Sequence, residues 1–231
     1  MSEHYEIVII GGGPGGYPAA IRAAQLGLRV ACIESRQRLG GTCLNVGCIP
    51  SKALLESSER FIAARTEFAE HGVEFEGLRL NLPKLMAHKD NVVSGLGNGI
   101  DFLMRKHKIT RLVGTGSVTA PGQVTVLDEA GQERTLTASS IVIATGSDSA
   151  ILSDVPIDEA RIVSSTGALA LPEVPKHLVV IGAGYVGLEL GSVWRRLGAN
   201  VTVIEYLDRI TSGMDTELSQ ALHKVLEEQG F

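Results

Sequence analysis

A chain of 231 residues, 44% of them hydrophobic, is long enough for one large domain or one and a half ordinary ones, with a substantial core. Its net charge is −5 and its Lys and Arg residues are dispersed, which disfavours nucleic acid or an anionic membrane as the main partner. No apolar run reaches the roughly 18 to 20 residues that cross a bilayer, and the N-terminus lacks the features of a signal peptide. Three cysteines are too few for a disulfide scaffold, so we expect a reducing, cytoplasmic location.

The chain begins with the pattern of a strand, a glycine-rich turn, a helix and a second strand. Residues 5–10 are a short apolar run typical of a buried parallel strand. The turn, residues 11–16 (GGGPGG), precedes an apolar helix that we expect to end near Leu26, because Gly27 follows. Residues 29–33 predict the second strand, which ends at Glu34.

The same pattern returns later in the chain. Residues 178–181 predict a strand, 182–187 (GAGYVG) a turn, the following residues a helix to about Leu197, and 201–204 a strand that ends at Glu205. One offset of 171 relates six pairs of residues, which indicates an internal repeat of a whole unit. These pairs are Gly11 and Gly182, Gly13 and Gly184, Gly16 and Gly187, Gly27 and Gly198, Val30 and Val201, and Glu34 and Glu205.

Helices and strands are also predicted between the two copies. We expect helices at about 48–70 and 82–107, a β-rich stretch at 111–136, a further buried strand at 141–144 and, after the second copy, a helix at 215–229. The predicted fold class is α/β, with two Rossmann-like dinucleotide-binding domains in three-layer parallel sheets and a β-rich meander. Residues 1–150 would be the first domain, and residues 151–231 an incomplete second one.

Each glycine turn matches G-x-G-x-x-G with an acid 18 residues after the third glycine. The first glycine permits a tight turn, the second lets the backbone approach a pyrophosphate, and the third lets helix and strand pack closely. Two copies in register disfavour the alternative of plain glycine-rich turns. Glu34 and Glu205 would bind ribose hydroxyls and repel a 2′-phosphate, so the nicotinamide cofactor is predicted to be NAD rather than NADP. Two sites suggest two cofactors, a flavin and a nicotinamide.

Cys43 and Cys48 lie in the segment GGTCLNVGCIPSK, and their spacing leaves three uses open. As metal ligands they lack partners, because a structural zinc site needs four ligands and only Cys32 remains, with no histidine beside the pair. A structural disulfide that closes so short a loop would stabilise the fold little. The third use is a redox pair.

Local geometry and charge favour the redox use. Residues five apart on an ideal helix point about 140° away from each other, so a bridge needs a distorted turn, which Gly47 and Pro50 supply. A strained disulfide of this kind is easily reduced. Pro50 suits the first turn of a helix, with an alternative helix start at Thr42, and in either case the helix dipole and Lys52 favour a thiolate. Cys32 is predicted to be a buried hydrophobic residue.

Taken together, these segments resemble the flavin-dependent pyridine nucleotide–disulfide oxidoreductases, and within them the dihydrolipoamide dehydrogenase branch. The resemblance covers nearly the whole chain and rests on the cysteine segment, the GGGPGGY turn, IVIATGS and GAGYVGLELGSVWRRLGANVTVIEYLDRI. Glutathione and mercuric reductases share the cysteine pair, but the residues around it and after Glu205 are closest to the NAD-dependent lipoamide branch.

Carried over by position, the resemblance implies a role for each site residue. Cys43 would be the interchange thiol attacked by dihydrolipoamide, Cys48 would be the thiolate beside the flavin, and Lys52 would approach the flavin and pair with Glu189. The residues implied to bind FAD are Gly11, Gly13, Gly16, Glu34, Gly41, Thr42, Lys52, Gly116, Thr145, Gly146 and Ser147. Those implied to bind NAD are Gly182, Gly184, Gly187, Glu189 and Glu205.

The resemblance also implies partners. Dihydrolipoamide would be carried on the lipoyl domain of a 2-oxo acid dehydrogenase complex or a glycine cleavage protein, and the full-length protein would be a homodimer. Members are roughly twice this length, so we expect an N-terminal fragment that is inactive alone and lacks the interface domain that carries the catalytic base. The alternatives are a related NAD(P)H-dependent disulfide or mercuric reductase, or a non-catalytic flavin-binding module.

Overall fold

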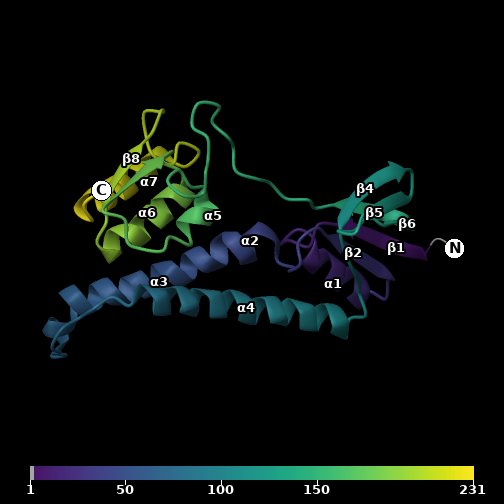
Figure 1. The fold of residues 1–231 in the computed structure, drawn as a ribbon, viewed down its shortest axis with the longest axis horizontal. Coiled ribbons are helices and arrows are strands. Elements are labelled where there is room, and N and C mark those ends of the chain that lie inside the picture. The colour runs from purple at the N-terminus through teal and green to yellow at the C-terminus, as the bar shows by residue number, and fades with distance from the viewer. Residues whose placement is uncertain (1–2) are drawn as a thin grey trace. The chain divides into compact units, whose positions relative to one another are not determined.

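The computed structural model describes residues 3–231, which form two compact units (Figure 1). The first unit contains the chain up to Ile49 and Asn91–Asp148, and the second contains Pro50–Asp90 and Ser149–Phe231. The boundary therefore passes through two long helices, α3 (Cys48–Thr66) and α4 (Leu82–Lys106). The division at residue 150 in the sequence analysis had counted residues 50–90 with the first domain.

The first unit is built on a six-stranded sheet in the order β3-β2-β1-β6-β5-β4. The first four strands in this order are parallel, and β4, β5 and β6 form an antiparallel meander. Besides parts of α3 and α4, the elements of this unit are β1 (Glu3–Ile10), α1 (Tyr17–Gln25), β2 (Val30–Glu34), α2 (Gly41–Val46), β3 (Thr110–Val113), β4 (Thr115–Ala120), β5 (Gln123–Leu127) and β6 (Glu133–Ile143).

Both faces of this sheet are covered by other parts of the first unit. Adjacent residues of a strand point to opposite faces, so neighbours in β1 belong to different core clusters. On one face, Ile9 and Cys32 pack with residues of α1 and α4 such as Ala20 and Met104. On the other face, Val8 packs against residues of β5 and β6 such as Val124 and Leu136. This burial explains why Ile7–Ile10 of β1 and Val30–Ile33 of β2 are apolar at consecutive positions rather than alternating. The predicted α/β fold class is confirmed.

The second unit combines a helical pair with a two-stranded parallel sheet of β7 (His177–Ile181) and β8 (Asn200–Ile204). Its other elements are η1 (Phe68–His71), α5 (Ser165–Ala168), α6 (Tyr185–Leu197) and α7 (Thr216–Glu228). Trp194 is fully buried in its core and donates a hydrogen bond from Nε1 to the Ala168 carbonyl at 3.0 Å. The buried Lys89 donates from Nζ to the next carbonyl, of Leu169, at 2.9 Å. These two donors satisfy the C-terminus of α5.

The repeat seen in the sequence is also a repeat in hydrogen-bond register. In the first copy Ile7 pairs with Val30, and in the second Leu178 pairs with Val201, so both partners move by the same 171 residues. The turn follows the same rule, since Gly11 N donates to Ile33 O at 2.7 Å and Gly182 N donates to Ile204 O at 2.8 Å. The two strand–turn–helix–strand units are therefore the same local structure.

Two predicted boundaries were wrong. The strand predicted at 141–144 is the end of one long strand, β6, which pairs with β5 through Thr137 and with β1 as far as Ile143. Because β6 pairs with β1 on one side and with β5 on the other, its polar residues before Ile141 also stay in an extended conformation. The helix predicted to reach residue 70 ends at Thr66, where η1 and a left-handed Gly72 (φ 72°) follow. Within residues 3–231, none of the helices is long and apolar enough to span a membrane.

Two glycines in α4, Gly95 and Gly99, have no packing reason in the described chain. A methyl group at Gly99 would meet no atom within 4 Å. We expect Gly99→Ala to raise the free energy of unfolding by about 0.5–1 kcal/mol, because alanine favours the helix over glycine. Urea unfolding of both proteins measures this, and a loss of stability would show that the position is packed against something in solution.

Candidate functional site

The first glycine turn is closed by contacts that only glycine permits. Gly11 has φ 109°, and a Cβ there would overlap the carbonyl oxygen of Ala144 at the end of β6. A Cβ at Gly16 would overlap the carbonyl oxygen of Gly11. Gly16 is also the N-cap of α1, and no side chain caps this helix. Tyr17 N–H already donates to Gly13 O at 3.0 Å and Pro18 has no N–H, so an anion such as a pyrophosphate would be attracted to this end chiefly by the helix dipole.

The acid after the second strand fastens each turn. Glu34, 7% exposed, accepts hydrogen bonds from Gly12 N at 2.8 Å and Arg36 N at 3.0 Å. Glu205 accepts the equivalent bonds from Ala183 N at 2.7 Å and Leu207 N at 2.9 Å. These two amides, Leu207 first, hold the pKa of Glu205 below its usual value, so it stays ionised at neutral pH. Each acid thus has a structural role besides the predicted ribose contact.

A cavity of about 630 Å³ opens beside the first turn, within the first unit. Nine of the residues predicted to bind FAD line it: Gly11, Gly13, Glu34, Gly41, Thr42, Gly116, Thr145, Gly146 and Ser147. Gly16 and Lys52 are not among its lining residues. The sequence analysis missed Ser35, Arg36, Gly114, Thr115 and Asp148, which adjoin predicted residues at the ends of β2, β3 and β6.

The cavity fits a flavin dinucleotide in size and chemistry. Its volume lies in the range of roughly 300–1,000 Å³ that small-molecule sites occupy. A Cβ at Gly41 would lie 2.6 Å from Gly13 Cα, so the backbone must be bare where these walls meet. The N-terminal end of the α1 dipole would attract phosphate, and Glu34 supplies an acceptor for a hydroxyl.

The cysteine segment contains the short helix α2 and the beginning of the long helix α3, rather than the start of a single helix. Cys43 lies in α2 and lines the cavity, and Cys48 is the exposed first residue of α3. Gly47 separates the helices, and a Cβ there would lie 2.9 Å from the Thr42 carbonyl oxygen and 3.3 Å from Cys43 Cα. Only glycine therefore lets the chain return so close to Cys43. Both helix starts weighed in the sequence analysis occur, whereas the redox role stays a prediction.

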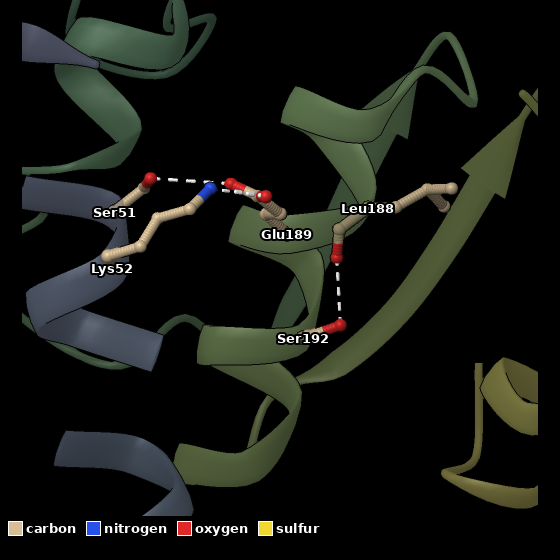
Figure 2. Close-up of polar contacts among 5 residues, drawn as sticks. All are labelled: Ser51, Lys52, Leu188, Glu189 and Ser192. Atoms are coloured by element: carbon tan, nitrogen blue, oxygen red, sulfur yellow. Dashed lines mark hydrogen bonds and ion pairs between the residues drawn. The ribbon is translucent and has the colours of Figure 1, made fainter. Parts of the chain in front are cut away.

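Lys52 and Glu189 form an ion pair inside the second unit (Figure 2). Lys52 Nζ on α3 lies 2.5 Å from Oε1 of Glu189 on α6, and the buried Ser51 donates from Oγ to the other carboxylate oxygen at 3.3 Å. Both oxygens of this carboxylate are thus held by neighbouring residues of one helix. The sequence analysis missed Ser51, although its place next to Lys52 was a usable signal. Ser192, in the same view, bonds within α6 to Leu188 O at 2.8 Å.

The second glycine turn, also in the second unit, is open where a dinucleotide would approach. A Cβ at Gly182 or Gly184 would meet no atom within 4 Å. A Cβ at Gly187 would lie 2.7 Å from Val180 Cγ1, so the third glycine lets α6 pack on β7. The first two glycines of this turn thus leave the backbone open to a ligand, and the third permits close helix–strand packing, as a dinucleotide site requires. The residues predicted to bind NAD in this turn fit that use.

Cys32 is confirmed as a buried residue and should not react. It is 0% exposed, and burial, helped by the charge of Glu34, raises the pKa of its thiol to about 12. The neutral thiol is not nucleophilic, so we expect no alkylation of Cys32 by iodoacetamide in the folded protein at pH 8, and full alkylation in denaturant. Mass spectrometry of the labelled peptides measures both, and rapid labelling of the native protein would contradict the placement. Across the described residues 3–231, no group of three or more His, Cys, Asp and Glu side chains could hold a metal ion.

Comparisons with known proteins agree with this geometry. A family model described as pyridine nucleotide-disulphide oxidoreductase matches residues 5–231. Dihydrolipoyl dehydrogenase 3 of Pseudomonas putida is 60% identical over 230 residues, which are 99% of this chain and 49% of the relative. Leghemoglobin reductase of Glycine max is 53% identical over 230 residues, 100% of this chain and 44% of the relative.

A solved structure is also similar. It is a Cu(II) complex of a cysteine-to-serine variant of RclA, an HOCl-induced flavoprotein disulfide reductase from Escherichia coli, with a TM-score of 0.81 and 27% identity. The match covers 100% of this chain and 48% of that one. The chain therefore spans about half the length of the relatives that it matches.

Proposed function

Because this chain belongs to the pyridine nucleotide-disulphide oxidoreductase family, we propose that it carries the flavin site, the redox cysteines and part of the nicotinamide site of a dihydrolipoyl dehydrogenase. The reaction would be oxidation of dihydrolipoamide to lipoamide with reduction of NAD⁺. The observation that carries this proposal is the glycine-lined cavity with Cys43 in its wall. Residues 1–150 and 151–231 would supply the FAD and NAD domains.

The first cavity would hold FAD, and the second turn would hold NAD. FAD, when bound, supplies a two-electron carrier between the cysteines and NAD⁺. The start of α1 would bind the FAD pyrophosphate, and Gly13 would let the backbone approach it. Gly184 would have the same role for NAD, and Glu205 would accept a ribose hydroxyl on a lone pair that the turn leaves unused.

The cysteine pair would exchange electrons with the substrate by disulfide exchange. A dihydrolipoamide thiolate attacks Cys43 Sγ of a Cys43–Cys48 disulfide, the S–S bond breaks, and Cys48 leaves as the thiolate. The second substrate thiolate then attacks the substrate sulfur of the mixed disulfide, releases lipoamide and leaves Cys43 reduced. Two electrons pass to the cysteine pair, and a base takes up the substrate protons.

The proposed role of Lys52 is to carry positive charge close to the cysteine pair. It lies one turn after Cys48 in α3, and Cys48 is the first residue of that helix. Glu189 would fix the position of Lys52, and Ser51 would fix that of Glu189. We therefore assign Ser51 as a positioning residue in this group.

The partners follow from the substrate. Dihydrolipoamide would be carried on a lipoyl domain of a 2-oxo acid dehydrogenase complex or a glycine cleavage protein. The full-length enzyme that receives it would be a cytoplasmic homodimer. A relative named leghemoglobin reductase shows that high identity in this half of the protein accompanies more than one named activity. The substrate therefore needs a direct test.

A chimaera provides that test. Residues 1–231 would replace the matching half of the Pseudomonas putida enzyme, and NADH oxidation would be assayed with lipoamide, glutathione disulfide and mercuric ion. We expect lipoamide to be the preferred substrate by kcat/KM. Preference for another acceptor would contradict the lipoamide assignment and favour a related reductase. Absence of activity with flavin bound would favour a non-catalytic flavin-binding module.

A further inference from the structure

The turn between α3 and α4 exposes a group of large apolar side chains. We refer to residues 67–78 as the hairpin tip (Figure 1). Its large apolar residues Phe68, Val73, Phe75 and Leu78 are 37%, 49%, 47% and 38% exposed. The rings of Phe68 and Phe75 meet edge to face with centroids 6.4 Å apart, so they are held together while facing solvent. Exposed apolar groups gathered in this way are typical of interaction surfaces.

The hairpin tip also carries most of the net charge of the chain. It contains four glutamates and no Lys or Arg, so its formal charge is −4, against −5 for all 231 residues. The glutamates are Glu67, Glu70, Glu74 and Glu76. No ion pair within residues 3–231 involves any of them. The tip therefore presents uncompensated negative charge next to apolar surface.

A groove continues from the tip within the second unit. It has a volume of about 780 Å³, begins at Gly77 and runs along residues 79–83 and 172–174. Leu80, Leu82 and Val174 give it an apolar part, and its lining holds one acid, Glu173, and one base, Arg79, so the excess negative charge lies at the tip. An extended peptide could thus place apolar side chains in the groove and basic ones over the tip.

We propose that the hairpin tip and this groove form a docking site for a basic segment of a partner protein, with large apolar residues among its Lys and Arg side chains. Charge complementarity selects this occupant. Two copies of the tip would repel each other, which disfavours self-association through it. Anionic membranes would be repelled for the same reason.

A peptide titration of the 231-residue chain tests the proposal. The probe is a synthetic peptide of alternating Lys and Leu, and the matched control peptide has Glu in place of Lys. We expect the Lys peptide to shift the backbone amide NMR signals of residues 67–83 and to leave the signals of the cavity beside Gly11 unchanged. Its affinity should fall as the salt concentration is raised. The Glu peptide should not bind. Shifts spread evenly over the chain, or equal binding of both peptides, would overturn the proposal.

Charge reversal gives an independent readout. We expect Glu74→Lys with Glu76→Lys to weaken binding of the Lys peptide by about tenfold or more at low salt. The matched control reverses Glu227 and Glu228 at the exposed end of α7, which changes the net charge equally and should alter binding less than about twofold. Equal weakening by both double variants would overturn the site. Sedimentation could instead show concentration-dependent dimers that the tip variant abolishes. A second copy of the chain would then be the occupant, and this result would also overturn the proposal of a basic partner segment.

Discussion

Replacing Cys43 or Cys48 with serine should abolish lipoamide turnover in the chimaera, with a loss of at least about a thousandfold in kcat/KM. Serine cannot form the disulfide, so each variant loses the group that accepts electrons from the substrate. Flavin binding should persist, because the lining of the cavity beside the first turn is otherwise unchanged. Steady-state assays with lipoamide and the visible absorbance of bound flavin measure the two effects separately.

Cys32→Ala is the matched control for these variants. Its side chain is buried in the core of the first unit and its pKa of about 12 keeps the thiol neutral. We expect this variant to retain turnover. A Cys43→Ser protein that retained full lipoamide activity would remove the disulfide from the account, whereas loss of activity in Cys32→Ala with intact folding would show that a third cysteine takes part.

Gly13→Ala should weaken FAD binding strongly without unfolding the chain. A Cβ at Gly13 would lie 3.4 Å from Gly41 Cα, an ordinary contact, but it would occupy the place where the pyrophosphate approaches the backbone. We expect affinity for FAD to fall by about a hundredfold or more, which corresponds to roughly 3 kcal/mol. Gly184→Ala, in the second turn, should lower affinity for NAD in the same way, because its Cβ would enter open space.

The third glycines are the controls for this prediction. A Cβ at Gly16 would overlap a backbone oxygen, and one at Gly187 would press on Val180, so Gly16→Ala and Gly187→Ala should destabilise the fold. Isothermal titration with each dinucleotide and thermal unfolding of all four variants measure binding and stability. Unchanged FAD affinity in Gly13→Ala, with the same melting temperature, would contradict the placement of the pyrophosphate.

Periodicity and spacing predicted most of the elements that position the site. The acid after each second strand and the glycine spacing predicted both turns, because a strand–turn–helix–strand unit is determined by local backbone requirements. The structure adds that Glu34 and Glu205 fasten those turns through backbone amides. The sequence analysis assigned these acids to ribose only, since a side chain-to-backbone bond across 22 residues leaves no local pattern.

Other features depend on contacts between distant parts of the chain. The continuity of β6 follows from having β1 on one side and β5 on the other, which no window of sequence shows. Ser51 meets Glu189 across 138 residues, and only the packing of α3 on α6 brings them together. The break at Gly47 was foreseen as a distortion, but the close approach of the chain to Cys43 Cα required the three-dimensional structure.

The central claim is that electrons pass between a Cys43–Cys48 disulfide and the nicotinamide cofactor through flavin bound in the glycine-lined cavity, so NADH should run the proposed reaction in reverse and reduce the disulfide. The most direct test is alkylation of the flavin-loaded chimaera with iodoacetamide under anaerobic conditions, with and without NADH, followed by mass spectrometry of the cysteine peptides. The account predicts labelling of Cys43 and Cys48 only after NADH, and none in the Gly13→Ala variant without flavin. Equal labelling with and without NADH would contradict it.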